Sequence, residues 1–126
     1  MAGLFSSFFK KKEELPPFHL SSLKADMHSH LIPGIDDGAP TIDHSIAMLS
    51  KFESLGYKKV ITTPHIMSDT FPNTPEIIKN GLANLKKEIK KTELKIEVEA
   101  AAEYYFDETI MPLIKKKELL SFGNKY

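Results

Sequence analysis

Two histidines and an aspartate lie close together in the motif Asp-Met-His-Ser-His at residues 26–30. In an extended chain, side chains two residues apart point in the same direction, so His28 and His30 can approach one metal ion together. Neutral imidazole is a good ligand for zinc, manganese and iron. Asp26 could accept a hydrogen bond from the far ring nitrogen of a ligating histidine and fix its tautomer. We therefore predict a metal-binding pair, with Asp26 as its orienting residue.

Two more candidate ligands follow the next two apolar stretches of the chain. His65 ends the sequence Thr-Thr-Pro-His, and Glu103 ends the sequence Ala-Ala-Ala-Glu. Taken alone, a histidine in this place is more often structural, and Glu103 could be an acid on the surface. The carboxyl ends of parallel strands meet on one rim, however, and active sites gather there. We therefore expect His65 and Glu103 to lie beside His28 and His30, with Glu103 able to bridge two cations.

The loop at residues 32–38 adds two adjacent carboxylates, Asp36 and Asp37. An Asp-Asp-Gly sequence alone is usually a solvated turn. Directly after a His-x-His pair, one of its carboxylates becomes a candidate metal ligand, and spacing alone does not choose between the two. His19 and His44 lie outside these motifs, and we expect them to be solvent-facing or packing residues.

Hydrophobic periodicity predicts the elements that must position these residues. The strands are expected at residues 23–28, 59–63 and 94–100. The helices are expected at about residues 41–55, from residue 74 and from residue 107. The apolar residues expected to face the core are Ile42, Ile46, Leu49 and Phe52 in the first helix, Ile78, Leu82, Leu85 and Ile89 in the second, and Ile110, Leu113 and Ile114 in the third.

The helix ends carry their own signals. Thr41, and Thr74 followed by Pro75, are good N-terminal caps, and Gly56 is well placed to end the first helix. Asp107 could cap the third helix. The resulting order of strand and helix, repeated three times, is typical of parallel βα units in an α/β sheet or barrel.

The length of the chain limits how much of a barrel it can form. A (β/α) barrel typically needs about 250 residues, whereas this chain has 126. Residues 121–126 resemble a turn that leads into a fourth strand. We therefore expect residues 24–126 to be the N-terminal half of such a barrel, truncated before the fourth strand. Residues 1–23 would be an N-terminal arm and a Pro-containing linker.

The composition excludes several classes of function. Lys+Arg and Asp+Glu both number 17, so no general attraction to nucleic acid or anionic membrane is expected. The absence of cysteine excludes disulfides, thiolate–zinc sites and a cysteine nucleophile within these residues. No apolar run approaches the ~18 residues of a membrane-spanning helix, and the N-terminus does not resemble a signal peptide. We expect a cytoplasmic protein, in which residues 1–12 form either a weak peripheral membrane contact or an arm that packs on the protein itself.

The motifs resemble those of the PHP (polymerase and histidinol phosphatase) superfamily, and within it the bacterial manganese-dependent tyrosine-protein phosphatases of the CpsB/YwqE type. The resemblance covers about residues 24–126 and rests on Asp-Met-His-Ser-His, Pro-Gly-Ile-Asp-Asp-Gly-Ala, Thr-Thr-Pro-His and Ala-Glu-Tyr-Tyr. It implies a distorted (β/α) barrel in which His28 and His30 bind one metal ion and Glu103 bridges it to a second. It also implies that Asp37, and not Asp36, joins His65 on a third. The family's other ligands and its phosphate-binding arginines come from later strands, beyond residue 126.

The resemblance further implies an enzyme that uses two or three Mn²⁺ ions to hydrolyse phosphotyrosine on proteins, in the control of capsule and exopolysaccharide synthesis. Iron, zinc and magnesium are alternative metals, and the partner would be an autophosphorylating tyrosine kinase of polysaccharide export. Two other hypotheses stay open. One is a phosphoesterase for a small molecule such as histidinol phosphate, and the other is an inactive half-barrel that only binds or assembles. Because half of the site is missing, we expect the isolated chain to be inactive.

Overall fold

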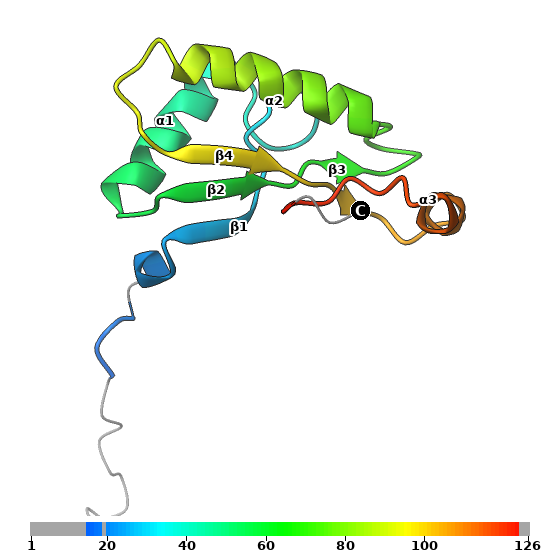
Figure 1. The fold of residues 1–126 in the computed structure, drawn as a ribbon, viewed down its shortest axis with the longest axis horizontal. Helices are drawn as coiled ribbons and strands as arrows, with labels where there is room; N and C mark the ends of the chain where they lie inside the picture. Colours follow the sequence, from blue (N-terminus) through cyan, green and yellow to red (C-terminus); the bar gives the residue numbers. More distant parts are fainter. Residues whose placement is uncertain (1–14, 19, 124–126) are drawn as a thin grey trace, which may run out of the picture.

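The computed structural model describes residues 15–18 and 20–123 of the chain. Three parallel strands form its main sheet in the order β1-β2-β4, with β1 at Ala25–Ser29, β2 at Lys59–Thr62 and β4 at Glu97–Ala100. Helices α1 (Ile42–Ser54) and α2 (Pro75–Ile89) lie on the same side of this sheet (Figure 1). The element order and the parallel pairing confirm the predicted α/β class.

The core lies between the sheet and these two helices. Leu49 of α1 and Leu85 of α2 are fully buried in one cluster with Val60 of β2 and Val98 of β4. Each such side chain contributes about 1.5–3 kcal/mol through its removal from water. The apolar stripes predicted for the first two helices face this cluster, as expected from their spacing.

Both helices begin where the sequence predicts. The side-chain oxygen of Thr41 accepts a hydrogen bond from the backbone N–H of His44 at 3.4 Å. The side-chain oxygen of Thr74 accepts one from the backbone N–H of Ile77 at 3.2 Å, and Pro75 opens α2. Gly56 follows α1 with a φ of +96°, a left-handed conformation that few other residues adopt without strain.

A second, shorter pair of parallel strands continues the main sheet, and sequence analysis did not predict it. Strand β3 (His65–Ile66) follows β2 after Pro64, and strand β5 (Glu103–Tyr104) follows β4 after two alanines. Pro64 has no N–H to donate, so it interrupts the ladder. Its carbonyl still accepts a hydrogen bond from Glu103 N at 3.0 Å, which keeps the two chains side by side.

Two predicted strands begin later than expected. The chain forms a 3₁₀ helix, η1, at Leu20–Leu23, and Lys24 has a φ of +60°, which is incompatible with a strand. Strand β4 begins at Glu97 because the backbone N–H of Lys95 bonds to the Glu53 side chain of α1 at 2.7 Å instead of joining the ladder.

The third helix, α3, spans Ile110–Lys116 and differs from the prediction in its cap and in its buried face. Asp107 lies too far upstream to cap it, and its carboxylate instead accepts a hydrogen bond from Thr109 N at 2.8 Å. Ile110 and Leu113 are half-buried, but Ile114 is 44% exposed. No residue of α3 is fully buried, so the prediction that Ile114 faces the core is wrong.

The segment after α3 packs beside β5. Leu120 donates its backbone N–H to the Tyr104 hydroxyl at 2.7 Å, and its carbonyl accepts from Ala102 N at 3.3 Å. The predicted membrane contact or packing arm at residues 1–12 lies outside the described residues, and so does the last part of the turn predicted at residues 121–126. Among the described helices, none has the length and apolar character that crossing a membrane requires.

Leu85→Ala should lower the free energy of unfolding by about 2–5 kcal/mol, because it leaves a cavity at the centre of the core. Denaturant unfolding of the 126-residue chain would measure this loss. Ile77→Ala is the matched control, since Ile77 lies on the same helix and is 41% exposed. Equal losses in the two variants would contradict the assignment of the core.

Candidate metal centre

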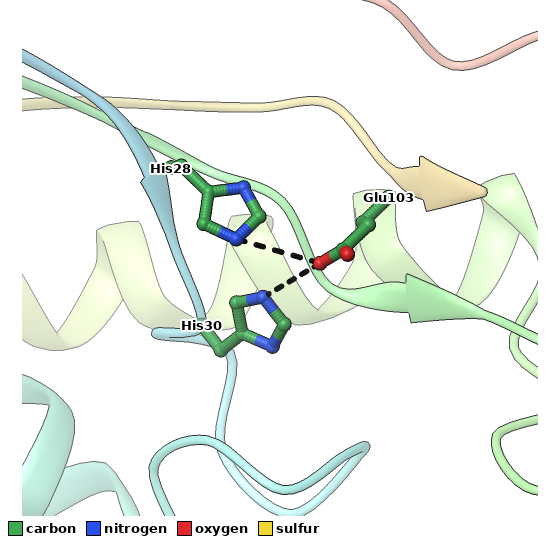
Figure 2. Close-up of side chains that lie close together, drawn as sticks. All are labelled: His28, His30 and Glu103. Carbon is green, nitrogen blue, oxygen red and sulfur yellow. Dashed lines mark ion pairs between the residues drawn. The ribbon is translucent and has the colours of Figure 1, made fainter. Parts of the chain in front are cut away.

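Histidine and carboxylate side chains from separate strands meet at the carboxyl ends of the sheet. Figure 2 shows His28 and His30, from the end of β1, both directed at the carboxylate of Glu103 at the start of β5. Oε2 of Glu103 lies 3.4 Å from Nε2 of His28 and 3.3 Å from Nε2 of His30. The same oxygen lies 3.5 Å from Nδ1 of His65, the first residue of β3. Histidines from two other strands, β1 and β3, therefore reach one carboxylate oxygen of β5.

Asp37 extends this cluster on the side of His65. Its Oδ1 lies 3.5 Å from Nε2 of His65 and 3.5 Å from Nδ1 of His30. Two groups of candidate ligands result, His28/His30/Glu103 and His30/Asp37/His65, and within each group the ligand atoms lie within 4.8 Å of one another. Ligands that bind a cation at about 2.0–2.2 Å have comparable mutual separations. The structure thus brings together all five residues predicted as ligands.

The charges of the cluster also suit a cation. Asp36, Asp37 and Glu103 contribute three carboxylates, and their only ion-pair partners among the described residues are imidazoles. Divalent cations are commonly held by such mixed sets of imidazole and carboxylate ligands. These residues fit a metal site in donor type, spacing and charge.

A β-bulge in β1 keeps Asp26 away from the cluster. Asp26 pairs with Val60 and Ser29 with Thr62, so β1 takes three residue steps where β2 takes two. The extra residue breaks the alternation that would have put Asp26 on the same face as His28. Oδ2 of Asp26 is buried and has no hydrogen-bond partner among the described residues. No hydrogen bond between Asp26 and a histidine, as predicted for an orienting residue, is present among the described residues.

Other residues hold the imidazoles instead. Thr63 places its hydroxyl 2.9 Å from Nδ1 of His28. Asn73 donates from its side chain to the carbonyl of His65 and to that of Ile35, both at 2.9 Å, and so ties the aspartate loop to β3. The ring of Phe71 stacks on His65, with the ring centres 5.3 Å apart. None of these contacts was predicted from the sequence, and the position of Thr63, two residues before His65 in Thr-Thr-Pro-His, does not indicate its contact with His28.

Two groups in the segment from β5 to α3 have shifted pKa values. Hydrogen bonds from the hydroxyl and the backbone N–H of Thr109, and from Ser68, lower the pKa of the Asp107 carboxyl. Burial raises the pKa of the Tyr104 phenol, which therefore stays protonated at neutral pH. The histidine outside the cluster, His44, only caps its own helix, with Nδ1 2.8 Å from the Thr41 hydroxyl. His19 lies outside the described residues.

Comparison with known proteins identifies the family of this chain. Residues 24–126 match the family described as "Capsular polysaccharide synthesis, CpsB/CapC". The chain belongs to the CpsB/CapC family. Its similarity to a crystal structure described as YwqE from Bacillus subtilis and CpsB from Streptococcus pneumoniae, "unique metal-dependent tyrosine phosphatases", has a TM-score of 0.70 at 28% identity. That match covers 77% of this chain and 39% of the other.

Curated relatives of this family carry tyrosine-phosphatase names. The putative tyrosine-protein phosphatase CapC of Staphylococcus aureus is 32% identical over 96 residues, which are 75% of this chain and 37% of the relative. The tyrosine-protein phosphatase YwqE of Bacillus subtilis is 27% identical over 99 residues, which are 79% of this chain and 39% of the relative. The chain therefore spans about two fifths of the length of the relatives that it matches.

Gly38→Ala should disturb the cluster, because an added Cβ would collide with the Cβ and the backbone of His30. We expect a loss of about 1–3 kcal/mol in stability from this overpacking. We also expect Mn²⁺ affinity to fall about 10-fold or more, as when residues that support metal ligands are changed. Calorimetric titration would measure the affinity. Gly123→Ala is the control for affinity: its Cβ meets no atom within 4 Å, so its cost is limited to the backbone strain of an alanine at a φ of +72°. A similar loss of affinity in both variants would contradict this account.

Proposed function

We propose that this chain forms part of a metal-dependent protein-tyrosine phosphatase that acts in the control of capsule or exopolysaccharide synthesis. The observation that carries the proposal is the convergence of His28 and His30, from the end of β1, and His65, from β3, on Glu103 of β5. Membership of a family whose relatives are named as tyrosine phosphatases supports it. The absence of cysteine from these residues leaves a metal-borne nucleophile as the chemistry they can serve.

In this proposal His28, His30 and Glu103 hold one cation, and Asp37 and His65 hold another. Mn²⁺ is the proposed metal, with two or three ions in the complete site. Such ions, when bound, polarise the phosphoryl oxygens and lower the pKa of a bound water. The residues of this chain would fix where the ions and the phosphate lie. Glu103 lies within 3.5 Å of both His30 and His65 and is the group placed to join the two halves of the cluster.

Phosphotyrosine suits a site of this kind. Tyrosine leaves as a phenolate whose conjugate acid has a pKa of about 10, so its departure needs less help from a general acid than that of serine. The side chains of His28 and Asp37 are 63% and 67% exposed, which leaves the cluster open to a residue on the surface of another protein. We propose as the substrate an autophosphorylating tyrosine kinase of polysaccharide export, which places the enzyme in the cytoplasm.

The complete site would need more than this chain supplies. All 17 basic residues are lysines, so the chain has no arginine with which to contact phosphate. The relatives are more than twice as long as the matched region. We propose that the missing ligands and arginines lie in the segments that those relatives have in addition, and that the 126-residue chain alone has little or no turnover.

The assay that tests this function compares a phosphotyrosine peptide with histidinol phosphate, with and without Mn²⁺. We expect the protein at its full natural length to hydrolyse the peptide only with the metal, and the 126-residue chain to turn over neither substrate. A preference for histidinol phosphate would replace the proposed substrate with a small molecule. If the full-length protein hydrolysed neither substrate, the remaining hypothesis would be that this chain serves only in binding or assembly.

His30→Ala should weaken Mn²⁺ binding by the 126-residue chain about 10–100-fold or abolish it, because His30 is a proposed ligand of the cation that His28 and Glu103 also hold. The wild-type chain should bind weakly and hold fewer ions than the full-length protein. Calorimetric titration measures both quantities. His44→Ala is the control, since this exposed imidazole lies on α1 and its one side-chain hydrogen bond among the described residues is to Thr41. Tight binding that survives His30→Ala would overturn the proposed ligand set.

A further inference from the structure

Asp36, the aspartate that the family resemblance does not make a ligand, is the most buried side chain of the cluster. Its side chain is 1% exposed, whereas that of its neighbour Asp37 is 67% exposed. Oδ2 of Asp36 lies 2.9 Å from Nδ1 of His30 and accepts the backbone N–H of His65 at 3.0 Å. Oδ1 accepts the backbone N–H of Gly38 at 3.0 Å. One carboxylate therefore contacts three segments that carry candidate ligands.

The bond to Asp36 decides which nitrogen of His30 carries the proton. An ionised carboxylate only accepts hydrogen bonds, so Nδ1 of His30 must be the donor. In a neutral imidazole the other nitrogen then has a free lone pair. That nitrogen, Nε2, is the one that lies 3.3 Å from Glu103 (Figure 2). His30 is thus prepared to bind a cation through Nε2 alone.

This choice of tautomer resolves an ambiguity in the cluster. By distance, His30 could serve the His28/Glu103 side through Nε2 or the Asp37/His65 side through Nδ1. Nδ1 lies 3.5 Å from Asp37 but only 2.9 Å from Asp36, within hydrogen-bond distance. With its Nδ1 proton held by Asp36, His30 is available only to the first group. Asp37 and His65 remain as the ligands of the second.

Asp36 also fixes the loop that presents Asp37. Its bond to Gly38 N closes an Asx turn around Asp37, and Ala39 N donates to the His30 carbonyl at 3.0 Å. The bond to His65 N then joins this turn to β3. Asp37 therefore faces His65 because the backbone on both sides of it is held.

We propose that Asp36 is a positioning residue that assigns His30 to the His28/Glu103 cation and holds Asp37 and His65 together for another. This inference rests on the proposed function in so far as it concerns metal binding. The tautomer that it requires belongs to the metal-free protein and does not depend on any enzymatic activity.

The direct test is the ring ¹⁵N spectrum of the histidines in the metal-free 126-residue chain. At about pH 8.5, above the usual titration range of imidazole, His30 should give the pattern of the Nδ1–H tautomer. A His30 ring protonated on Nε2 would overturn the proposal. This measurement needs no variant and so does not depend on whether a variant folds.

Asp36→Asn tests the consequence for metal binding. The amide keeps one acceptor oxygen, so its NH₂ group must face either the Gly38 N–H or the pair of donors from His30 and His65. In the second arrangement His30 can become an acceptor at Nδ1 by moving its proton to Nε2, which removes that nitrogen as a ligand, while the backbone N–H of His65 loses its acceptor. We expect Nε2–H signal to appear for His30 and the Mn²⁺ affinity of the first group to fall about 10–100-fold.

Asp37→Asn is the matched control, because it changes the adjacent, exposed carboxylate. We expect it to leave the His30 tautomer and the first cation in place and to weaken only the second. If both variants gave the same tautomer and the same loss of affinity, Asp36 would have no distinct role. If the tautomer were as expected but phosphotyrosine were not hydrolysed at full length, the proposed function would fail and the role of Asp36 would stand.

Discussion

The pairing of β3 with β5 is the constraint on which the candidate metal centre depends. It places His65 directly beside Glu103, on neighbouring parallel strands whose backbones lie about 4.8 Å apart. This register is set by main-chain hydrogen bonds, including those from Glu103 N to Pro64 O and from Tyr105 N to Ile66 O. The relative position of the two side chains is therefore fixed by the backbone, and the histidines of β1 need only reach a carboxylate that is already in place.

The apolar core and the ligand cluster occupy different parts of the main sheet. On the side of α1 and α2, Val60 and Val98 are buried in the core. The neighbouring residues of the same strands point to the other side, where Lys59 lies 2.6 Å from Glu99 and 3.2 Å from Glu97. Its hydrogen bond to Glu99 raises the pKa of Lys59, and the same bond lowers the pKa of Glu99. The ligand cluster lies at the end of the strands, where its charges do not disturb the apolar packing.

Much of this arrangement could be predicted from the sequence, because periodicity and strand order are local signals. The caps at Thr41 and Thr74, the stripes of the first two helices and the convergence of His28, His30, His65 and Glu103 all follow from such signals. The failures have tertiary causes. Asp26 was expected to accept a hydrogen bond from a ligating histidine, but a register shift in β1 separates it from the histidines and its buried Oδ2 has no hydrogen-bond partner among the described residues.

The roles of Asn73 and Asp36 could not be predicted from the sequence either, because they depend on tertiary contacts. Asn73 lies in a loop eight residues after His65, and nothing in its neighbours indicates that its amide returns to that carbonyl. Asp36 and Asp37 are equivalent in composition and spacing, and only burial and contact distances tell them apart.

The uneven exposure of the ligands has a consequence for how solvent would reach a bound metal. The side chains of His30 and His65 are 14% and 19% exposed and are held by neighbours, while those of His28 and Asp37 are largely in solvent. Each proposed cation would then have one ligand enclosed by the protein and one that faces solvent. Solvent would therefore reach each cation from the side of its exposed ligand, His28 or Asp37.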